Sequence, residues 1–169
     1  AALLVALGLA NLTGQALSRD AYFNQPRAWI DTALGPIRLE AGRAAEAQMI
    51  LAELRANLTP DETIFVFGWG GGWYLASGRP NRTAFDLALP GLGTSGDEAR
   101  RLQAELTAAP PSVVILTPGF WQPSTESDPA HDDHLRQLDV WQLRLQRDYS
   151  QKPLPGVSSW VLLVRQPSP

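Results

Sequence analysis

The chain has 169 residues, enough for one domain with a sizeable hydrophobic core. Hydrophobic residues make up 44% and charged residues 18%, a balance that excludes a charge-rich disordered chain. The net charge of −3 provides no basic surplus for a polyanion, so nucleic acid is not an expected partner. The absence of cysteine excludes disulfides, thiolate nucleophiles and cysteine-ligated metal sites.

The N-terminal sequence points to a membrane. It opens with AALLVALGLANL, in which leucine, valine and alanine lie on every face of the first turns of a helix. A bilayer needs about 20 apolar residues, so we expect residues 1–17 to be the end of a transmembrane helix. A signal-peptide core and a buried or amphipathic helix of a soluble protein are the alternatives. Residues 18–38 are then a juxtamembrane segment whose Tyr22, Phe23 and Trp29 suit a membrane–water interface, or else an ordinary loop packed on the domain.

Residues 39–169 are predicted to form an α/β domain. Helical periodicity predicts helices over residues 40–57, 97–108 and 132–149, and a short helix over residues 73–77. Apolar, β-rich runs predict strands over residues 63–68, 112–118 and 157–165, with a further short strand over residues 82–86. This alternation predicts a small, mostly parallel sheet flanked by helices, in which the last strand is the candidate for an antiparallel direction.

The order of these motifs resembles a known family. The segments TPDETIFVFGW, LASGRPNRTAF and APPSVVILTP resemble the C-terminal extracytoplasmic domain of polytopic membrane glycosyltransferases, over about residues 40–165. The nearest type is the dolichyl-phosphate-mannose–protein mannosyltransferases and their bacterial relatives, the aminoarabinose transferases. In that family the catalytic acidic residue lies in a loop near the first transmembrane helices, so the resemblance places no catalytic residue in this chain.

The resemblance implies a setting for the domain. It implies a cell membrane, with the domain on the extracytoplasmic side as an accessory to an enzyme that moves a sugar from a polyprenyl-phosphate carrier to a protein or lipid hydroxyl. The implied partners are the transmembrane half of the same polypeptide, a lipid-linked sugar and the membrane surface, and no cofactor is expected. Two alternatives remain open, namely a non-catalytic membrane-tethered binding or assembly domain and a soluble α/β enzyme that uses a nucleotide.

The glycine-rich turn GWGGGW, which follows the first predicted strand, is the main candidate for ligand contact. Its spacing fits neither a P-loop nor a dinucleotide fingerprint, whose third glycine would fall at Trp73, and no lysine is near. Aromatic rings there offer flat faces to sugars or lipid headgroups. The candidate substrate-binding residues of this segment are Trp69, Gly70, Gly71, Gly72, Trp73 and Tyr74. The alternative is that the glycines allow tight turning while the tryptophans pack in the core.

Two arginines after the turn complete the predicted binding set. Arg79 and Arg82 follow the end of the first predicted strand, where guanidinium groups suit bidentate contact with a lipid phosphate. The alternative is that they pin a loop through carboxylate or carbonyl oxygens, with Asp86 as one candidate partner.

The sequence HDDH is the only segment typical of metal ligands. His131 and His134 share a helix face, but the two aspartates between them need not point the same way. We interpret the segment as the N-terminal cap of a helix, with Asp132 or Asp133 as the capping residue, and predict no metal site.

Overall fold

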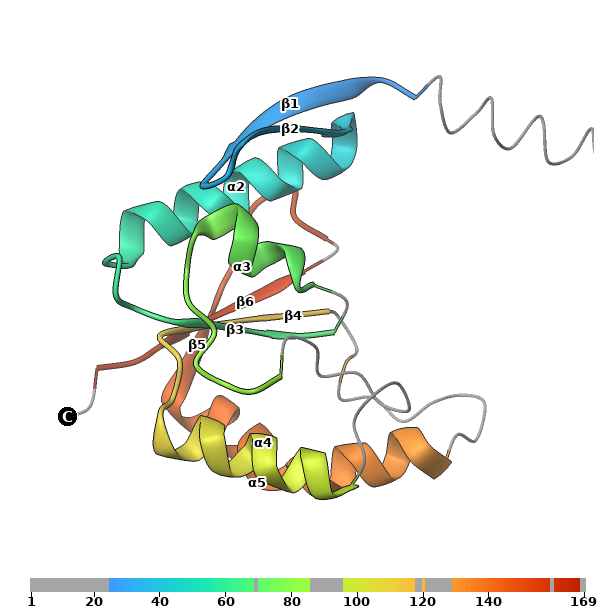
Figure 1. Ribbon diagram of the computed structural model, residues 1–169, viewed down its shortest axis with the longest axis vertical. Coiled ribbons are helices and arrows are strands. Elements are labelled where there is room, and N and C mark those ends of the chain that lie inside the picture. Colours follow the sequence, from blue (N-terminus) through green and yellow to red (C-terminus); the bar gives the residue numbers. More distant parts are fainter. Residues whose placement is uncertain are drawn as a thin grey trace, which may run out of the picture.

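A computed structural model describes residues 25–68, 70–85, 96–117, 120, 129–158 and 160–167, without the side chains of residues 129–135 and 137. The described residues form four helices and two sheets (Figure 1). The helices are α2 (Ala41–Asn57), α3 (Gly72–Ser77), α4 (Gly96–Ala108) and α5 (Pro129–Asp148). The strands are β1 (Arg27–Thr32), β2 (Gly35–Glu40), β3 (Ile64–Phe67), β4 (Val113–Leu116), β5 (Tyr149–Lys152) and β6 (Val161–Arg165). The predicted α/β class is therefore confirmed.

The main sheet has the strand order β3-β4-β6-β5 and is mixed. β3 and β4 are parallel, whereas β6 is antiparallel to both β4 and β5. The expectation of a mostly parallel sheet is wrong. The unpredicted strand β5 is the cause, because the short loop between β5 and β6 can join antiparallel neighbours, whereas a parallel pair needs a crossover of a dozen or more residues.

The strands of the main sheet are covered on both faces, as their continuous apolar sequences indicate. On β3, Ile64 and Val66 belong to the core that contains α2, while Phe65 and Phe67 belong to the core that contains α4 and α5. Figure 1 shows α2 and α3 above the sheet and α4 and α5 below it. Trp141 of α5 is the largest side chain completely buried in the lower core, where α5 meets the sheet.

An antiparallel hairpin of β1 and β2 forms a further layer on α2 (Figure 1). For residues 18–38 the sequence predicted a juxtamembrane segment or a packed loop, and it did not predict this hairpin. Its inner face buries Ile30, and Ala28 and Leu39 pack beside it against the core. At its tip, the Ala33 N–H donates to the Ala76 carbonyl at 2.9 Å and so attaches the hairpin to α3.

Two further expectations have a structural outcome. Residues 82–85 form no strand, so the predicted strand over residues 82–86 is wrong in its described part; there the Ala84 N–H donates to the Glu105 carboxylate at 2.9 Å instead. No helix in the described ranges is both long and apolar enough to cross a bilayer, and residues 1–17 lie outside those ranges.

The turn after β3 provides a test of the fold. Gly68 has φ +106°, and a Cβ there would collide with the Thr117 side chain, so Gly68→Ala is expected to lower the free energy of unfolding by about 1–3 kcal/mol. Gly72 faces open space in the first turn of α3, so Gly72→Ala is expected to be neutral or stabilising by up to about 1 kcal/mol. Urea unfolding of the two variants measures both values, and equal effects would contradict this account.

Candidate functional site

Three strand ends meet at one edge of the main sheet. Because β3 and β4 are parallel, their last residues, Phe67 and Leu116, pair with each other. Because β6 runs the other way, its first residue, Val161, pairs with Leu116. The glycine turn that follows β3 therefore lies close to Trp160, which immediately precedes β6.

The first turn of α3 is fixed by backbone and by Tyr74. The Trp73 N–H donates to the Gly70 carbonyl at 2.8 Å and begins the turn. The buried Tyr74 hydroxyl accepts a hydrogen bond of 2.9 Å from the N–H of Val66, on the edge strand of the described sheet. Tyr74 thus satisfies a backbone donor that the sheet leaves unpaired, and it anchors α3 to β3.

Gly70 allows two indole rings to meet. A Cβ at this position would collide with Val66, lie 2.9 Å from Cδ1 of Trp73 and lie 3.2 Å from Cη2 of Trp160. The rings of Trp73 and Trp160 are 5.6 Å apart between centroids and almost perpendicular, at 88°. Edge-to-face aromatic pairs of this kind are worth about 0.5–1.5 kcal/mol beyond their burial.

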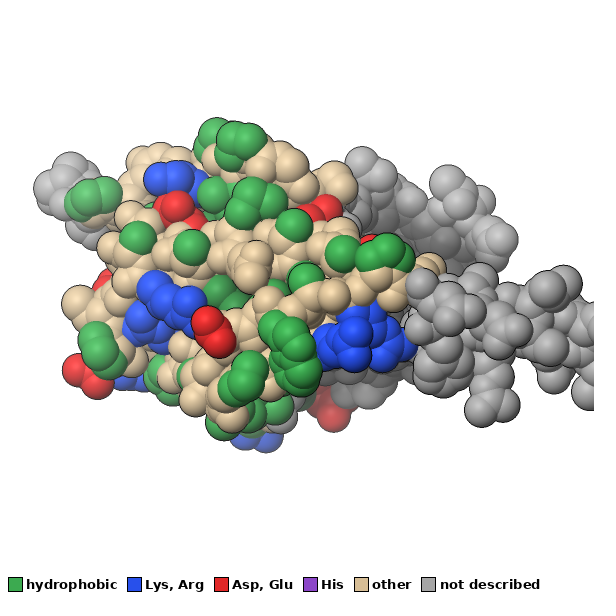
Figure 2. Space-filling model, turned by 90° about the horizontal axis from the view of Figure 1, so that it is seen from above, with side chains coloured by type: hydrophobic (Ala, Val, Ile, Leu, Met, Phe, Trp, Pro, Cys, Tyr) green, Lys and Arg blue, Asp and Glu red, His purple; other side chains and the backbone are tan. Residues whose placement is uncertain are grey.

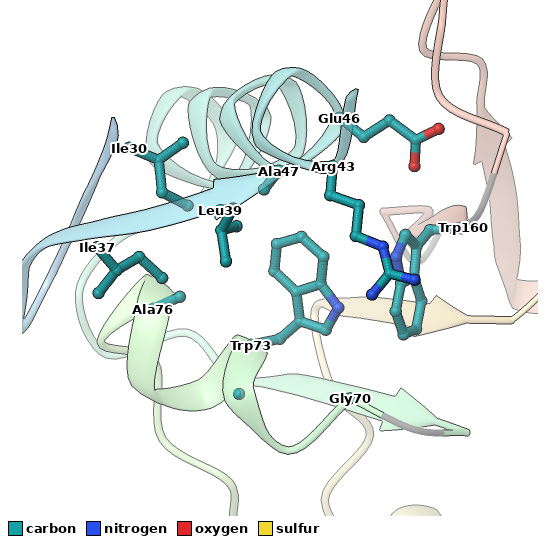
Figure 3. Close-up of a pocket in the computed structure, with 11 residues that line it drawn as sticks. Ile30, Ile37, Leu39, Arg43, Glu46, Ala47, Gly70, Trp73, Ala76 and Trp160 are labelled. Carbon is teal, nitrogen blue, oxygen red and sulfur yellow. The ribbon is translucent and has the colours of Figure 1, made fainter. Parts of the chain in front are cut away.

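These rings form one wall of an open groove of about 570 Å³ between the hairpin, α2 and α3 (Figure 3). This volume lies in the range of about 300–1,000 Å³ typical of small-molecule sites. The hairpin contributes aliphatic side chains, α2 contributes one basic and one acidic side chain, and the turn and α3 contribute small residues beside the indoles. The lining residues are Ile30, Ile37, Leu39, Arg43, Glu46, Ala47, Gly70, Gly72, Trp73, Ala76 and Trp160.

The two charged residues of the groove have different roles. Arg43 extends from α2 towards the indole rings (Figure 3), and its side chain is 85% exposed, with Glu40 at 3.9 Å as a weak ion-pair partner. Glu46 accepts hydrogen bonds from the N–H and the hydroxyl of Ser158, at 3.2 and 3.1 Å. Glu46 therefore holds the loop that leads into Trp160, while the Arg43 guanidinium is accessible to a ligand.

Arg79 is engaged outside the groove. Its guanidinium donates to the carbonyl of Leu58 at 2.8 Å and to the carbonyl of Thr59, in the connection after α2. This is the carbonyl contact of the loop-pinning alternative. Arg82 is exposed and is not among the groove residues.

The same connection holds an acidic partner. The Thr59 N–H and hydroxyl donate to the Glu62 carboxylate at 2.7 and 3.0 Å. The Thr59 N–H first, and then its hydroxyl, lower the pKa of Glu62 below the ordinary 4.5, with smaller contributions from Ser112 and the Arg79 charge. Thr59 is therefore held on one side by Glu62 and on the other by Arg79.

The structure brings only part of the predicted site together. The groove is lined by Gly70, Gly72 and Trp73. Gly71 is the residue before α3, and Tyr74 of α3 is buried. Trp69 and Asp86 lie outside the described residues, as do the side chains of the weak metal candidates His131 and His134. Within the described part of the chain, no group of three potential metal ligands is close enough to hold an ion.

Sequence reasoning missed three groups of residues in the groove. Arg43 and Glu46 were part of a predicted helix with no binding role, and Ile37 and Leu39 lie where no strand was predicted. Trp160 was treated as an ordinary residue of the last predicted strand. The available signal was a tryptophan directly before a strand that begins at the edge of the glycine turn, but recognising it required the direction of β6.

Comparison with models of known protein families, with curated proteins and with solved structures found no match for this chain. The functional argument therefore depends on the geometry of the groove and on the sequence motifs.

The contacts of Arg79 predict a structural role that Arg82 does not share. Arg79→Ala removes the cation from two carbonyl contacts and is expected to lower the free energy of unfolding by about 1–3 kcal/mol. Arg82→Ala, at an exposed position, is expected to change it by less than about 0.5 kcal/mol. Chemical denaturation of both variants measures the difference, and an unchanged midpoint for Arg79→Ala would contradict the structural role.

The depressed pKa of Glu62 predicts a pH dependence. A carboxyl whose pKa is lower in the folded state stabilises the fold above its ordinary pKa of 4.5, and this stabilisation is lost as the pH falls through the folded pKa. The wild type is therefore expected to exceed Glu62→Gln in stability at neutral pH, with a gap that narrows below about pH 4.5. Urea unfolding of both proteins across this range measures the gap, and a constant gap would contradict the assignment.

Proposed function

We propose that this chain is the accessory extracytoplasmic domain of an integral-membrane glycosyltransferase, which transfers a sugar from a polyprenyl-phosphate carrier to a protein or lipid acceptor. The order of sequence motifs supports this function. The groove between the hairpin, α2 and α3 carries the proposal, because its chemistry suits each part of a lipid-linked sugar.

The walls of the groove match the parts of an amphiphile. Ile37 and Leu39 offer an aliphatic surface for an isoprenyl chain, and Ile37 is 40% exposed before any ligand binds. The perpendicular rings of Trp73 and Trp160 offer an apolar face and a ring edge to a sugar. The guanidinium of Arg43 is the phosphate-binding group, because it is always charged and presents a planar set of donors.

The proposed role is binding and not bond breaking. The groove contains one carboxylate, Glu46, and Ser158 already hydrogen-bonds to it. A glycosyl transfer needs a carboxylate placed to act as base or nucleophile towards the substrate. That residue is expected in the transmembrane half of the same polypeptide.

A non-catalytic membrane-tethered binding domain is the second candidate. It is favoured equally by the groove residues, which include no free acid–base pair. Determining the sequence encoded upstream of residue 1 distinguishes the glycosyltransferase from the binding domain. Several apolar spans, with acidic residues in the first outward loop, support the glycosyltransferase. A single apolar span would contradict it and leave the binding domain.

Arg43 gives the direct test of the groove. Arg43→Gln removes a charge from an exposed side chain and is expected to weaken binding of a short-chain polyprenyl phosphate by roughly threefold to tenfold, without changing stability. Arg147→Gln is the matched control, because Arg147 is 72% exposed on α5 and is expected to leave binding unchanged.

The measurement is a titration with the glycosylated carrier lipid, the same lipid without sugar, and a neutral polyprenol. The phosphate lipids should lose affinity in Arg43→Gln and the polyprenol should not. Equal affinities for the Arg43→Gln variant, the Arg147→Gln variant and the wild type would remove the groove from the proposal.

A further inference from the structure

We propose that the outer face of the β1–β2 hairpin, together with Leu34 at its tip and Leu75 of α3, lies on the surface of a bilayer that contains anionic lipids. This contact rests on the membrane location in the proposed function. It uses side chains that project away from the groove, so the two can be tested separately.

Of the six exposed large apolar side chains among the described residues, four lie on the hairpin and α3, and the other two, Val140 and Leu143, lie on α5. Trp29 is 63% exposed, Leu34 74% and Leu75 61%, and Ile37 is exposed beside the groove. The Ala33–Ala76 hydrogen bond joins the hairpin tip to α3. Leu34 is the residue after Ala33 and Leu75 the residue before Ala76, so both flank this junction. Exposed apolar side chains that gather in this way mark an interaction surface.

The outer face of the hairpin has the composition of a membrane interface. Trp29 lies opposite Arg38 in the strand register, and Arg27 lies two residues from Trp29 on the same face. An indole and long cationic side chains are the groups that accumulate at headgroup depth. Figure 2 looks down on this side of the molecule and shows hydrophobic side chains interspersed with basic and acidic ones.

The charge of this face is less negative than that of the whole chain. The outer face carries two arginines, Arg27 and Arg38, and two carboxylates, Asp31 and Glu40, so its formal charge is zero; the Glu40 carboxylate also accepts hydrogen bonds from the first N–H groups of α2. The chain as a whole has a net charge of −3. Approach to an anionic surface is therefore opposed less through the hairpin than through the rest of the chain, and each arginine close to the headgroups contributes about 1 kcal/mol.

The sequence before the hairpin favours a bilayer as the partner of its outer face, rather than a second copy of the chain or another protein. β1 begins at Arg27, and the stretch before it includes residues 1–17, which are expected on sequence grounds to be the end of a transmembrane helix. Ten residues of chain span at most about 35 Å, so the start of β1 lies within that distance of residue 17. The hairpin is thus the first described element after the expected anchor.

Because the chain has no cysteine, single-cysteine variants can test the contact at chosen positions of the full chain. Leu34→Cys and Leu75→Cys report on the hairpin side. Val140→Cys and Leu143→Cys are matched controls, since these side chains are 60% and 65% exposed on α5, which covers the other face of the sheet (Figure 1). Each variant carries an environment-sensitive fluorophore, and its unfolding midpoint is checked against the wild type.

The labelled chains are bound to phosphatidylcholine vesicles with or without phosphatidylglycerol, and with brominated lipids as quenchers. The expected result is blue-shifted, quenchable emission at positions 34 and 75 only, which is stronger with phosphatidylglycerol and weakened by salt. Equal responses at all four positions, or none at 34 and 75, would overturn the contact, as would a response that depends on protein concentration without vesicles. Equal responses with and without phosphatidylglycerol would overturn the anionic preference.

Failure of this experiment is distinct from failure of the proposed function. If the labels at positions 34 and 75 show no lipid contact while Arg43 still controls binding of the polyprenyl phosphate, the membrane-facing surface lies elsewhere. If the labels respond and Arg43 has no effect, the hairpin contacts lipid and the groove does not hold the carrier.

Discussion

The antiparallel pairing of β6 with β4 is the constraint on which the groove depends. It brings the start of β6 to the sheet edge where β3 and β4 end, and so places Trp160 beside Trp73. A parallel β6 of the same five residues would carry Trp160 to the opposite edge, roughly 16 Å away at about 3.3 Å per residue. The groove would then lose one of the two indole rings that form its wall.

Close packing at this edge then determines the shape of the site. Gly70 lets the turn lie beneath both indoles, because any side chain there would meet Val66 and the two rings. Tyr74 attaches α3 to β3, and Glu46 holds the loop before Trp160 through Ser158. Each wall of the groove is thus fixed by a contact behind it, while Arg43 extends from α2 into solvent. A site with fixed walls and one exposed charged side chain loses little conformational freedom on binding.

The parts of the fold that sequence could predict are those that depend on local periodicity. The helix over residues 40–57 and the buried strands over residues 63–68 and 112–118 match α2, β3 and β4 within the usual uncertainty of boundaries. The hairpin was missed because Pro26 directly precedes β1 and Pro36 lies within β2, and β5 was missed because its sequence YSQK is polar. The direction of β6 is set by long-range pairing, which no local pattern contains.

The same difference between local pattern and long-range topology explains which residues of the site could be predicted from the sequence. Gly70 and Trp73 were found because the glycine-rich turn is conspicuous in the sequence, and both line the groove. Trp160, Arg43 and Glu46 were not found, because they join the site only through the sheet topology and the packing of α2. Arg79 shows the reverse case, a residue of the expected chemical type in the expected place whose donors are taken up by carbonyls after α2.

The hairpin links the two proposed surfaces, since a strand presents alternate side chains to opposite faces. Ile37 and Leu39 of β2 line the groove, while Arg38 between them pairs with Trp29 on the outer face. One layer of backbone therefore separates the groove from the proposed lipid contact. A carrier lipid whose chain stays in the bilayer would need to cross only the edge of this layer to bring its phosphate to Arg43. In this proposal, the exposed Ile37, on the strand that borders both surfaces, would give an isoprenyl chain an apolar path between them.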